Sequence, residues 1–249
     1  MKYLGTITIL GAVLAASAPL ACATPIQLGS YATGANPQGN ANTALSLVAK
    51  DLTGTKPTSL GTLTSIPPGP NNTTYALNPN GVWADPVANS TWVGIASTAG
   101  PGTGAGYANP AYGYYEFQTT FDATAGTYDG ILNVLADDTV EVLLNGNILV
   151  NFGALGTDGL CADNPPGCQL STETSLLLND ITLDATNTLD FIVEQAGNQA
   201  GAPGSDPSGV DFNANLTPTP EPGTLFLLGT GLLGAAGIAR RRFAAKFNA

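Results

Sequence analysis

Acidic side chains are the main candidates for chemistry in this sequence, because it contains no histidine. That absence excludes catalytic triads and general bases built on histidine. Asp137, Asp138 and Glu141 lie close together in ADDTVEVLLNG, and a pair of carboxylates can hydrolyse a glycoside. The two aspartates, however, directly precede a predicted hairpin, where aspartate side chains commonly bond the turn backbone. We therefore expect a turn or surface role for these acids and no enzymatic activity.

The same acids are candidates for binding a metal ion. Two oxygen-rich stretches, LADD and GSDPSGVDF, supply the carboxylates of Asp137, Asp138, Asp206 and Asp211. Carboxylates and backbone carbonyls are the ligands that calcium prefers, although the spacing matches no calcium-loop motif. We expect no organic cofactor, and a structural calcium ion is the one cofactor hypothesis that these residues support.

Aromatic residues gather between positions 83 and 115. Exposed rings can stack on sugars, whereas large aromatic side chains are more often mostly buried. Trp92 lies in the apolar stretch STWVGIAS, which indicates a core position. Trp83, Tyr107 and Tyr112 lie in Pro-, Asn-, Gly- and Ala-rich loops and are the candidate carbohydrate contacts, with a core position equally open for Trp83.

The first 23 residues have the pattern of a secretory signal peptide. Met1-Lys2 is followed by an apolar run to Leu20, and Ala21 and Ala23 form a small-x-small cleavage site. Signal peptidase is therefore an expected partner. An uncleaved N-terminal helix and lipoprotein processing at Cys22 are the alternatives.

Two cysteines remain after this cleavage, Cys161 and Cys168 in CADNPPGC. Exported proteins meet an oxidising compartment, so a disulfide between the two cysteines is expected. Closing this short loop should stabilise the folded state by about 2–3 kcal/mol. Zinc is the alternative, but two thiolates without a histidine make a poor zinc site.

The charge distribution indicates an acidic domain between the two ends of the chain. The formal net charge is −11, and Lys50 and Lys56 are the only basic residues between Thr24 and Pro220. The same span holds all of the 18 acidic residues except Glu221. Such a surface repels nucleic acid and anionic membrane faces. We expect a soluble extracellular domain that does not bind nucleic acid.

Strands are the elements that must position these side chains. YYEFQTTFD alternates apolar and polar residues, which is typical of a half-buried strand. Asn145-Gly146 separates two β-rich runs and predicts a hairpin, with Val140, Val142 and Leu144 on its buried face. Further strands are expected in GILNVLA, SLLLNDITLDATNTLDFIVEQ and GVDFNANL, and only short pieces such as TALSLV and STWVGIAS before residue 113. Short strands at this spacing indicate an antiparallel sandwich.

The stretch from Asn89 to Leu216 resembles galactose-binding-like jelly-roll domains of secreted bacterial proteins. The similarity lies in the aromatic strand that ends in FD, in ADDTVEVLLNG, in NTLDFIVEQ and in GVDF. It implies an all-β, antiparallel jelly-roll β-sandwich of eight to nine strands, and many such domains hold one structural calcium ion. The same fold hosts adhesive, carbohydrate-binding and purely structural modules.

The C-terminal segment resembles the PEP-CTERM sorting signal in all three of its parts and in their order. These parts are a Pro-Glu-Pro motif, an apolar stretch and a basic stop, formed by Pro220, Glu221, Pro222, residues 224–239, Arg240, Arg241 and Arg242. The resemblance implies processing by an exosortase, a membrane protease-transpeptidase of Gram-negative bacteria that make extracellular polysaccharide. A helix over 224–239 would span about 24 Å of a hydrocarbon core about 30 Å thick, with the arginines held in the cytoplasm. We expect a transient transmembrane helix in the inner membrane, and a permanent anchor is the alternative.

Three regions are thus predicted: a signal peptide over 1–23, a β-sandwich over 24–216 and a sorting signal over 217–249. The expected function is a structural or adhesive role at the cell surface or in the extracellular matrix of a biofilm. A carbohydrate-binding module for the organism's own exopolysaccharide is the alternative, and a secreted hydrolase is the third reading.

Overall fold

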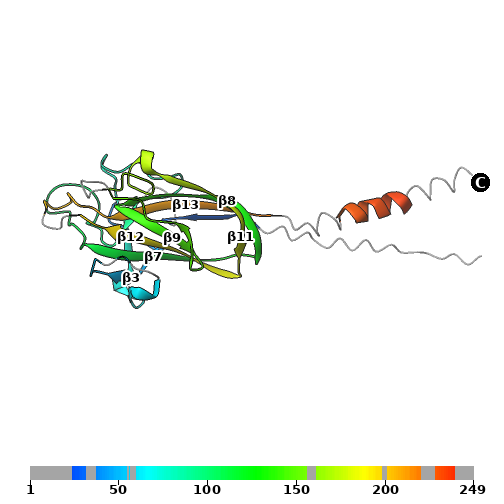
Figure 1. Cartoon of the computed structure of the whole chain (residues 1–249), viewed down its shortest axis with the longest axis horizontal. Helices are drawn as coiled ribbons and strands as arrows, with labels where there is room; N and C mark the ends of the chain where they lie inside the picture. Colours follow the sequence, from blue (N-terminus) through cyan, green and yellow to red (C-terminus); the bar gives the residue numbers. More distant parts are fainter. Residues whose placement is uncertain are drawn as a thin grey trace, which may run out of the picture.

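Two antiparallel sheets pack face to face and form a β-sandwich, as the sequence predicts (Figure 1). The computed structural model describes residues 24–31, 38–54, 56, 60–155, 161–197, 201–219 and 228–238. The predicted signal peptide with Ala21 and Ala23, the motif Pro220–Pro222 and the basic stop Arg240–Arg242 lie outside the described residues.

The first sheet contains seven strands. Their order is β11 (Thr174–Leu183), β8 (Gly126–Asp137), β13 (Gly209–Pro218), β6 (Val93–Gly94), β5 (Thr74–Ala76) and β2 (Ala41–Asn42). The seventh strand, β1 (Ile26–Gly29), pairs with the C-terminal part of β13. The long strands β8, β11 and β13 were predicted, whereas the predicted strand STWVGIAS is reduced to the two residues of β6.

The second sheet contains six strands. Their order is β10 (Asn147–Val150), β9 (Thr139–Leu144), β12 (Thr186–Gln195), β7 (Gly113–Asp122), β3 (Ser46–Asp51) and β4 (Thr64–Ser65). Short 3-10 turns occur at Leu60–Thr62, Pro70–Asn72 and Leu170–Thr172. The galactose-binding-like resemblance implied eight to nine strands; the short strands before residue 113 account for the larger number seen here.

One α-helix is described, over residues 228–238. The stretch predicted to cross the membrane, 224–239, extends beyond the described helix at both ends. Within the described part of the chain, no helix has both the length and the apolar character needed to cross a membrane. The transmembrane segment therefore stays a prediction.

The core lies between the two sheets and follows the predicted alternation. Tyr115, Phe117 and Phe121 of β7 point into it, and so does the predicted hairpin face of Val140, Val142 and Leu144. Phe191 of β12 meets Phe212 of β13 across the sheet interface, with ring centroids 4.3 Å apart. At the hairpin tip, Asn145 and Gly146 both have positive φ angles, 50° and 78°, as a tight two-residue turn requires.

The chain changes sheets between consecutive long strands. Strand β8 belongs to the seven-stranded sheet and β9 to the six-stranded sheet, so the chain crosses between them at Asp138. Strands β11 and β12, which are adjacent in the sequence, likewise lie in different sheets. These crossings bring the end of β8, the end of β12 and the start of β13 to one end of the sandwich, which we call the loop end.

The outer face of the six-stranded sheet carries a small second core with buried acids. Tyr114, Leu143 and Ile192 form an apolar cluster there with Ala49 and Leu63. Glu116 lies on the same face, directly opposite Ile192, and is only 6 % exposed. Burial, and next the charge of Asp190, raises the pKa of Glu116 to about 7 from a usual value of 4.5.

We expect Glu116 to make the protein less stable as the pH rises from 4.5 to about 7. The folded state holds this proton more tightly than the unfolded chain, so its contribution is complete below pH 4.5 and is lost above the folded pKa. The loss is about 2–3 kcal/mol. In urea unfolding, Glu116→Gln should match the parent near about pH 4 and exceed it by that amount near about pH 8. An equal difference at both pH values would contradict the assignment.

Candidate functional site

Three aspartates and a glutamine meet at the loop end of the sandwich. Asp137 ends β8, Asp138 follows it at the crossing into β9, Gln195 ends β12, and Asp206 lies in the loop before β13. All four residues are buried, with exposed fractions of at most 2 %. We call Asp137, Asp138, Gln195 and Asp206 the acid cluster.

Asp137 and Asp138 each accept one side-chain hydrogen bond from outside the acid cluster, and Gln195 is joined to the backbone of Asp206. Trp83 Nε1 donates to Asp137 Oδ2 at 2.5 Å, and the backbone N–H of Ala196 donates to Asp138 Oδ2 at 2.6 Å. Gln195 Nε2 donates to the backbone oxygen of Asp206 at 3.4 Å. These bonds orient the side chains of Asp137, Asp138 and Gln195, and each of these side chains keeps one oxygen that takes no part in them.

The remaining oxygens of the acid cluster are buried without a hydrogen-bond partner among the described residues. They are Asp137 Oδ1, Asp138 Oδ1, Gln195 Oε1 and Asp206 Oδ2. A buried acceptor without a partner costs about 1–3 kcal/mol, and more when it is charged. Native proteins rarely tolerate several such atoms in one place unless an ion or water satisfies them.

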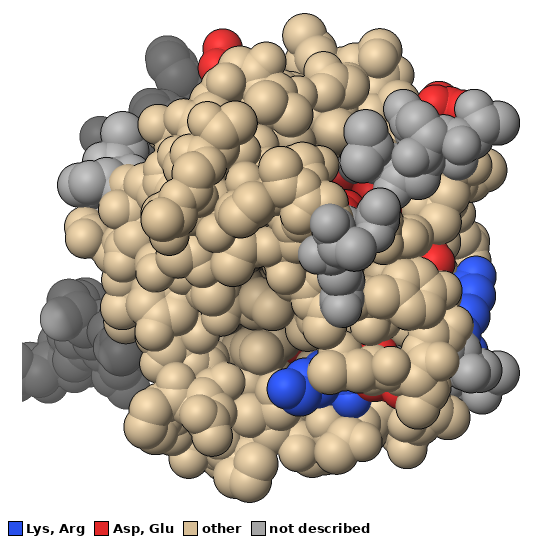
Figure 2. All heavy atoms as spheres, turned by 90° about the vertical axis from the view of Figure 1, so that its left-hand side faces the viewer, with Lys and Arg blue, Asp and Glu red and all other residues tan. Residues whose placement is uncertain are grey.

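The electrostatic environment of the acid cluster lacks compensating positive charge. Burial raises the pKa of Asp137 well above its usual range, and the charges of Asp138 and Asp206 raise it further. Burial also raises the pKa of Asp138 to about 7. It raises the pKa of Asp206 above its usual value as well. The neighbouring charges that act on Asp137 and Asp138 are all acidic. Viewed from the loop end, charged side chains are sparse on the surface (Figure 2).

A calcium ion at the acid cluster stays a prediction. Oxygen atoms are the donors that calcium selects, and three ionised carboxylates would carry one negative charge more than the ion neutralises. Among the described residues, the acidic and cysteine side chains whose ligand atoms all lie within 4.8 Å of one another are Asp137, Cys161 and Cys168. Gly197 belongs to the same arrangement, because a Cβ at that position would overlap the Asp206 carboxylate. Asp137, Asp138 and Asp206 lie at the same end of the sandwich, and their role as calcium ligands stays a prediction. The surface role expected for Asp137 and Asp138 is wrong, because both side chains are buried.

Asp211 does not join the acid cluster, and this part of the prediction is wrong. Its carboxylate accepts hydrogen bonds from the hydroxyls of Ser30 and Ser90 and from the backbone N–H of Val87. Asp211 therefore ties two loops to β13, and both of its carboxylate oxygens have a hydrogen-bond partner. Burial still raises its pKa to about 6.

Gln195 and Gly197 are site residues that the sequence did not reveal. The pairing of Glu194 with Thr139 sets the end of β12 beside the residue after Asp138. That register depends on which strands become neighbours, and alternation of apolar residues along a single strand does not specify it.

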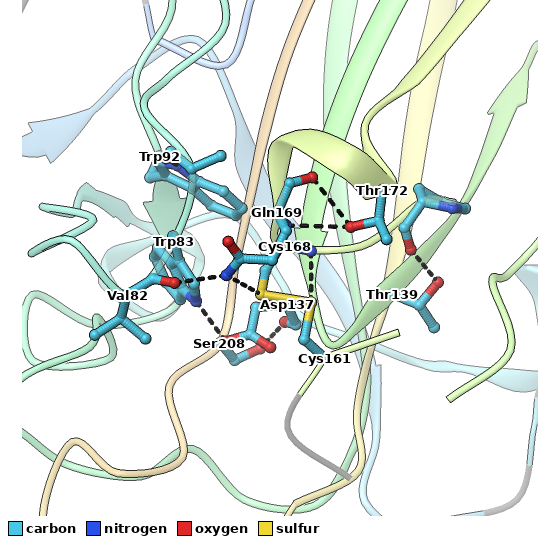
Figure 3. The surroundings of a disulfide bond; sticks show 12 residues. Val82, Trp83, Trp92, Asp137, Thr139, Cys161, Cys168, Gln169, Thr172 and Ser208 are labelled. Atoms are coloured by element: carbon cyan, nitrogen blue, oxygen red, sulfur yellow. Dashed lines mark hydrogen bonds between the residues drawn. A yellow bond between two sulfur atoms is a disulfide. The ribbon is translucent and has the colours of Figure 1, made fainter. Parts of the chain in front are cut away.

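A tryptophan pair and a disulfide lie beside Asp137 of the acid cluster (Figure 3). The rings of Trp83 and Trp92 stack with centroids 4.3 Å apart. Cys161 and Cys168 are paired as a disulfide with Cα atoms 5.8 Å apart, and both sulfur atoms lie within 4.8 Å of an Asp137 oxygen. With the sulfurs bonded to each other, these cysteines offer no thiolates for zinc.

The predicted carbohydrate contacts separate into different environments. Trp83 is 4 % exposed and packs on Trp92, so its role as a surface contact is corrected to a core position beside Asp137. Tyr107 is half-buried, and its hydroxyl accepts a hydrogen bond from Asn80 Nδ2 at 3.1 Å. Tyr112 is 41 % exposed. For Tyr107 and Tyr112 a sugar contact stays a prediction.

The fold and the acid cluster define an antiparallel β-sandwich with an oxygen-lined site at one end. Residues 218–242 match the PEP-CTERM protein-sorting motif. The chain therefore carries the sorting signal predicted from its C-terminal segment, and this motif implies export and processing by an exosortase.

Other comparisons add little to this assignment. No curated protein sequence matches the chain significantly. Similar solved structures include a family 35 carbohydrate binding module from Clostridium thermocellum, with 16 % identity, a TM-score of 0.25, and coverage of 53 % of this chain and 82 % of the module. A β-glucosidase from Kluyveromyces marxianus in complex with glucose has 11 % identity and a TM-score of 0.28, and the match covers 76 % of this chain and 18 % of the enzyme. TM-scores this low carry no argument about function.

Proposed function

We propose that the protein is a non-enzymatic component of the cell surface or extracellular matrix of a Gram-negative bacterium, with a structural or adhesive role. The observation that carries the proposal is the sorting motif at residues 218–242, which starts where β13 ends at Pro218. The rigid sandwich leads directly into the processing signal. In this reading the exosortase delivers a folded, strongly acidic domain to the outside of the cell.

The environment of the acids supports a structural role over hydrolysis. A glycosidase needs two carboxylates that a substrate and a water molecule can reach. Asp137, Asp138 and Asp206 are at most 2 % exposed, and Glu116 and Glu141 are at most 9 % exposed. Of these acids, Asp137, Asp138 and Asp206 lie inside the loop end, and we include a structural calcium ion bound there in the proposal.

Replacing Pro220, Glu221 and Pro222 together by alanine should block processing. In a host that carries an exosortase, we expect the variant to accumulate in the inner-membrane fraction with its C-terminal segment intact. The parent chain should leave that fraction with a shortened C-terminus. Cell fractionation followed by intact-mass measurement distinguishes the two, and the mass also reports signal cleavage after Ala23 and the two hydrogens lost on disulfide formation.

The matched control is the double change Pro67→Ala and Pro68→Ala, at exposed loop positions outside the motif. It should be processed like the parent. Equal release of the parent and the alanine variant of the motif, both with full-length C-termini, would show that the motif is not used.

A further inference from the structure

The disulfide loop places two sulfur atoms beside a buried carboxylate (Figure 3). Ligand atoms of Asp137, Cys161 and Cys168 all lie within 4.8 Å of one another. Trp83 Nε1 donates to one oxygen of Asp137, whereas Asp137 Oδ1 is buried without a hydrogen-bond partner among the described residues. Asp137 is 1 % exposed and Cys168 is 4 % exposed. A carboxylate with one unsatisfied oxygen thus lies next to both sulfurs.

Both sulfurs accept hydrogen bonds from N–H groups. The backbone N–H of Cys168 donates to Cys161 Sγ at 2.7 Å, and Gln169 Nε2 donates to Cys168 Sγ at 3.4 Å. A neutral sulfur is a weak acceptor, whereas hydrogen bonds to a charged acceptor are about twice as strong. These donors would therefore stabilise the two cysteines as thiolates.

Hydrogen bonds hold the loop against the sheets without help from the disulfide. The residue after the first cysteine, Ala162, donates its backbone N–H to the backbone oxygen of Asp138 at 3.0 Å. The residue before the second cysteine, Gly167, accepts from the backbone N–H of Ala136 at 3.1 Å. Ala136 and Asp138 are the two neighbours of Asp137 in the chain. Reduction should therefore leave both cysteines beside that carboxylate.

We propose that the reduced form of the protein binds one zinc ion through the thiolates of Cys161 and Cys168 and the carboxylate of Asp137. Zinc accepts sulfur and carboxylate oxygen together in tetrahedral sites, whereas calcium takes oxygen alone. Three protein ligands leave the fourth position to water. The chain has no histidine, so the third ligand becomes apparent only where β8 ends beside the loop. The inference goes beyond the role proposed above and requires neither the calcium ion nor the sorting motif.

A dithiol reductant, such as dithiothreitol, supplies the two thiolates. One of its thiolates attacks a sulfur of the disulfide, forms a mixed disulfide and releases the other cysteine. Its second thiol then displaces the remaining cysteine, and the reductant leaves as a cyclic disulfide. Two electrons and two protons pass from the reductant to the cysteines, and the protons enter solvent when zinc binds the thiolates. Cys161 is half-buried and thus more accessible to the reductant than Cys168.

Cobalt(II) tests the proposal as a spectroscopic substitute for zinc, since sites of this kind bind several divalent first-row metals. The mature exported protein is reduced with dithiothreitol, freed of reductant under nitrogen and titrated in calcium-free buffer. One cobalt ion per chain should bind, with a sulfur-to-cobalt charge-transfer absorption in the near ultraviolet that added zinc abolishes. The oxidised protein should show no such absorption, because its sulfurs are bonded to each other.

Three variants assign the ligands in the reduced protein. Cys161→Ser should lose the charge-transfer absorption, and Asp137→Asn should keep it but bind cobalt at least about tenfold more weakly. Asp138→Asn is the matched control, because Asp138 is an equally buried neighbour outside the group of ligand atoms. It should bind cobalt like the parent. Circular dichroism checks that each reduced protein is folded.

X-ray absorption spectroscopy of the zinc-loaded parent counts the ligands without any substitution. It should show two sulfurs at about 2.3 Å and two oxygens at about 2.0–2.2 Å from zinc. The proposal is overturned if the reduced parent binds no metal, if zinc has four sulfur ligands or none, or if Asp137→Asn binds cobalt as tightly as Asp138→Asn. A reduced chain that is unfolded both with and without zinc would also overturn it. None of these results bears on export, or on the calcium response of the oxidised protein.

Discussion

Adding millimolar calcium to protein stripped of divalent cations is expected to raise the melting temperature by about 8–16 °C. Four buried oxygens of the acid cluster have no hydrogen-bond partner among the described residues, and a bound cation would satisfy them. A ligand present at about a thousand times its Kd stabilises the folded state by about 4 kcal/mol, and in a chain of this size each kcal/mol shifts the melting temperature by about 2–4 °C. Differential scanning calorimetry with and without a chelator measures the shift.

Two isosteric variants locate the calcium effect. Asp206→Asn removes one charge and should abolish most of the shift, whereas Asp211→Asn should keep it. Asp211 is a fair comparison because it is equally buried and lies in the same part of the chain, but its carboxylate is already filled by Ser30, Ser90 and Val87. If neither the parent nor the Asp211 variant responds to calcium, the acid cluster is not a calcium site.

Trp83→Ala is expected to lower the free energy of unfolding by about 3–5 kcal/mol. The ring is 4 % exposed and stacks on Trp92, so its removal leaves a large cavity at the loop end. The change also leaves Asp137 Oδ2 without its donor, which adds to the loss. Urea unfolding, followed by circular dichroism, measures the difference.

Trp83→Phe separates these two contributions. The phenyl ring retains most of the packing on Trp92 but cannot donate to Asp137, so the loss should fall to about 1–3 kcal/mol. Tyr112→Ala, which truncates an exposed ring, should cost less than about 0.5 kcal/mol. If Trp83→Ala, like Tyr112→Ala, cost less than about 0.5 kcal/mol, the Trp83 ring would not pack in the core.

The long strands could be predicted because their signals are local. In β7 and β9 the apolar residues alternate along a single strand, and the Asn145-Gly146 turn requires positive φ at two adjacent positions. The strands before residue 113 could not be predicted in the same way. They contain two to six residues, and their pairing with distant strands such as β13 and β7 determines where they lie.

Three of the four residues of the acid cluster were named from the sequence, and for two of them the reason is local. Asp137 and Asp138 are adjacent in the chain, so their closeness needs no knowledge of the fold. Asp206 and Asp211 looked equivalent because both are acids of the oxygen-rich stretch GSDPSGVDF, although a strand was expected from Gly209 onward. What separates them is β13: Asp206 lies before the strand and Asp211 within it, beneath the loop that carries Ser90.

The course of β13 has a mechanical consequence. This strand begins opposite Asp137 at the loop end and finishes at Pro218, where the sorting motif starts (Figure 1). Its ten residues pair with β8 on one side, and four of them also pair with β1 on the other. Antiparallel hydrogen bonds run perpendicular to the strand, so a pull along β13 loads them all in shear at once. A protein tethered through its processed C-terminus would thus resist tension along the strand best placed to carry it.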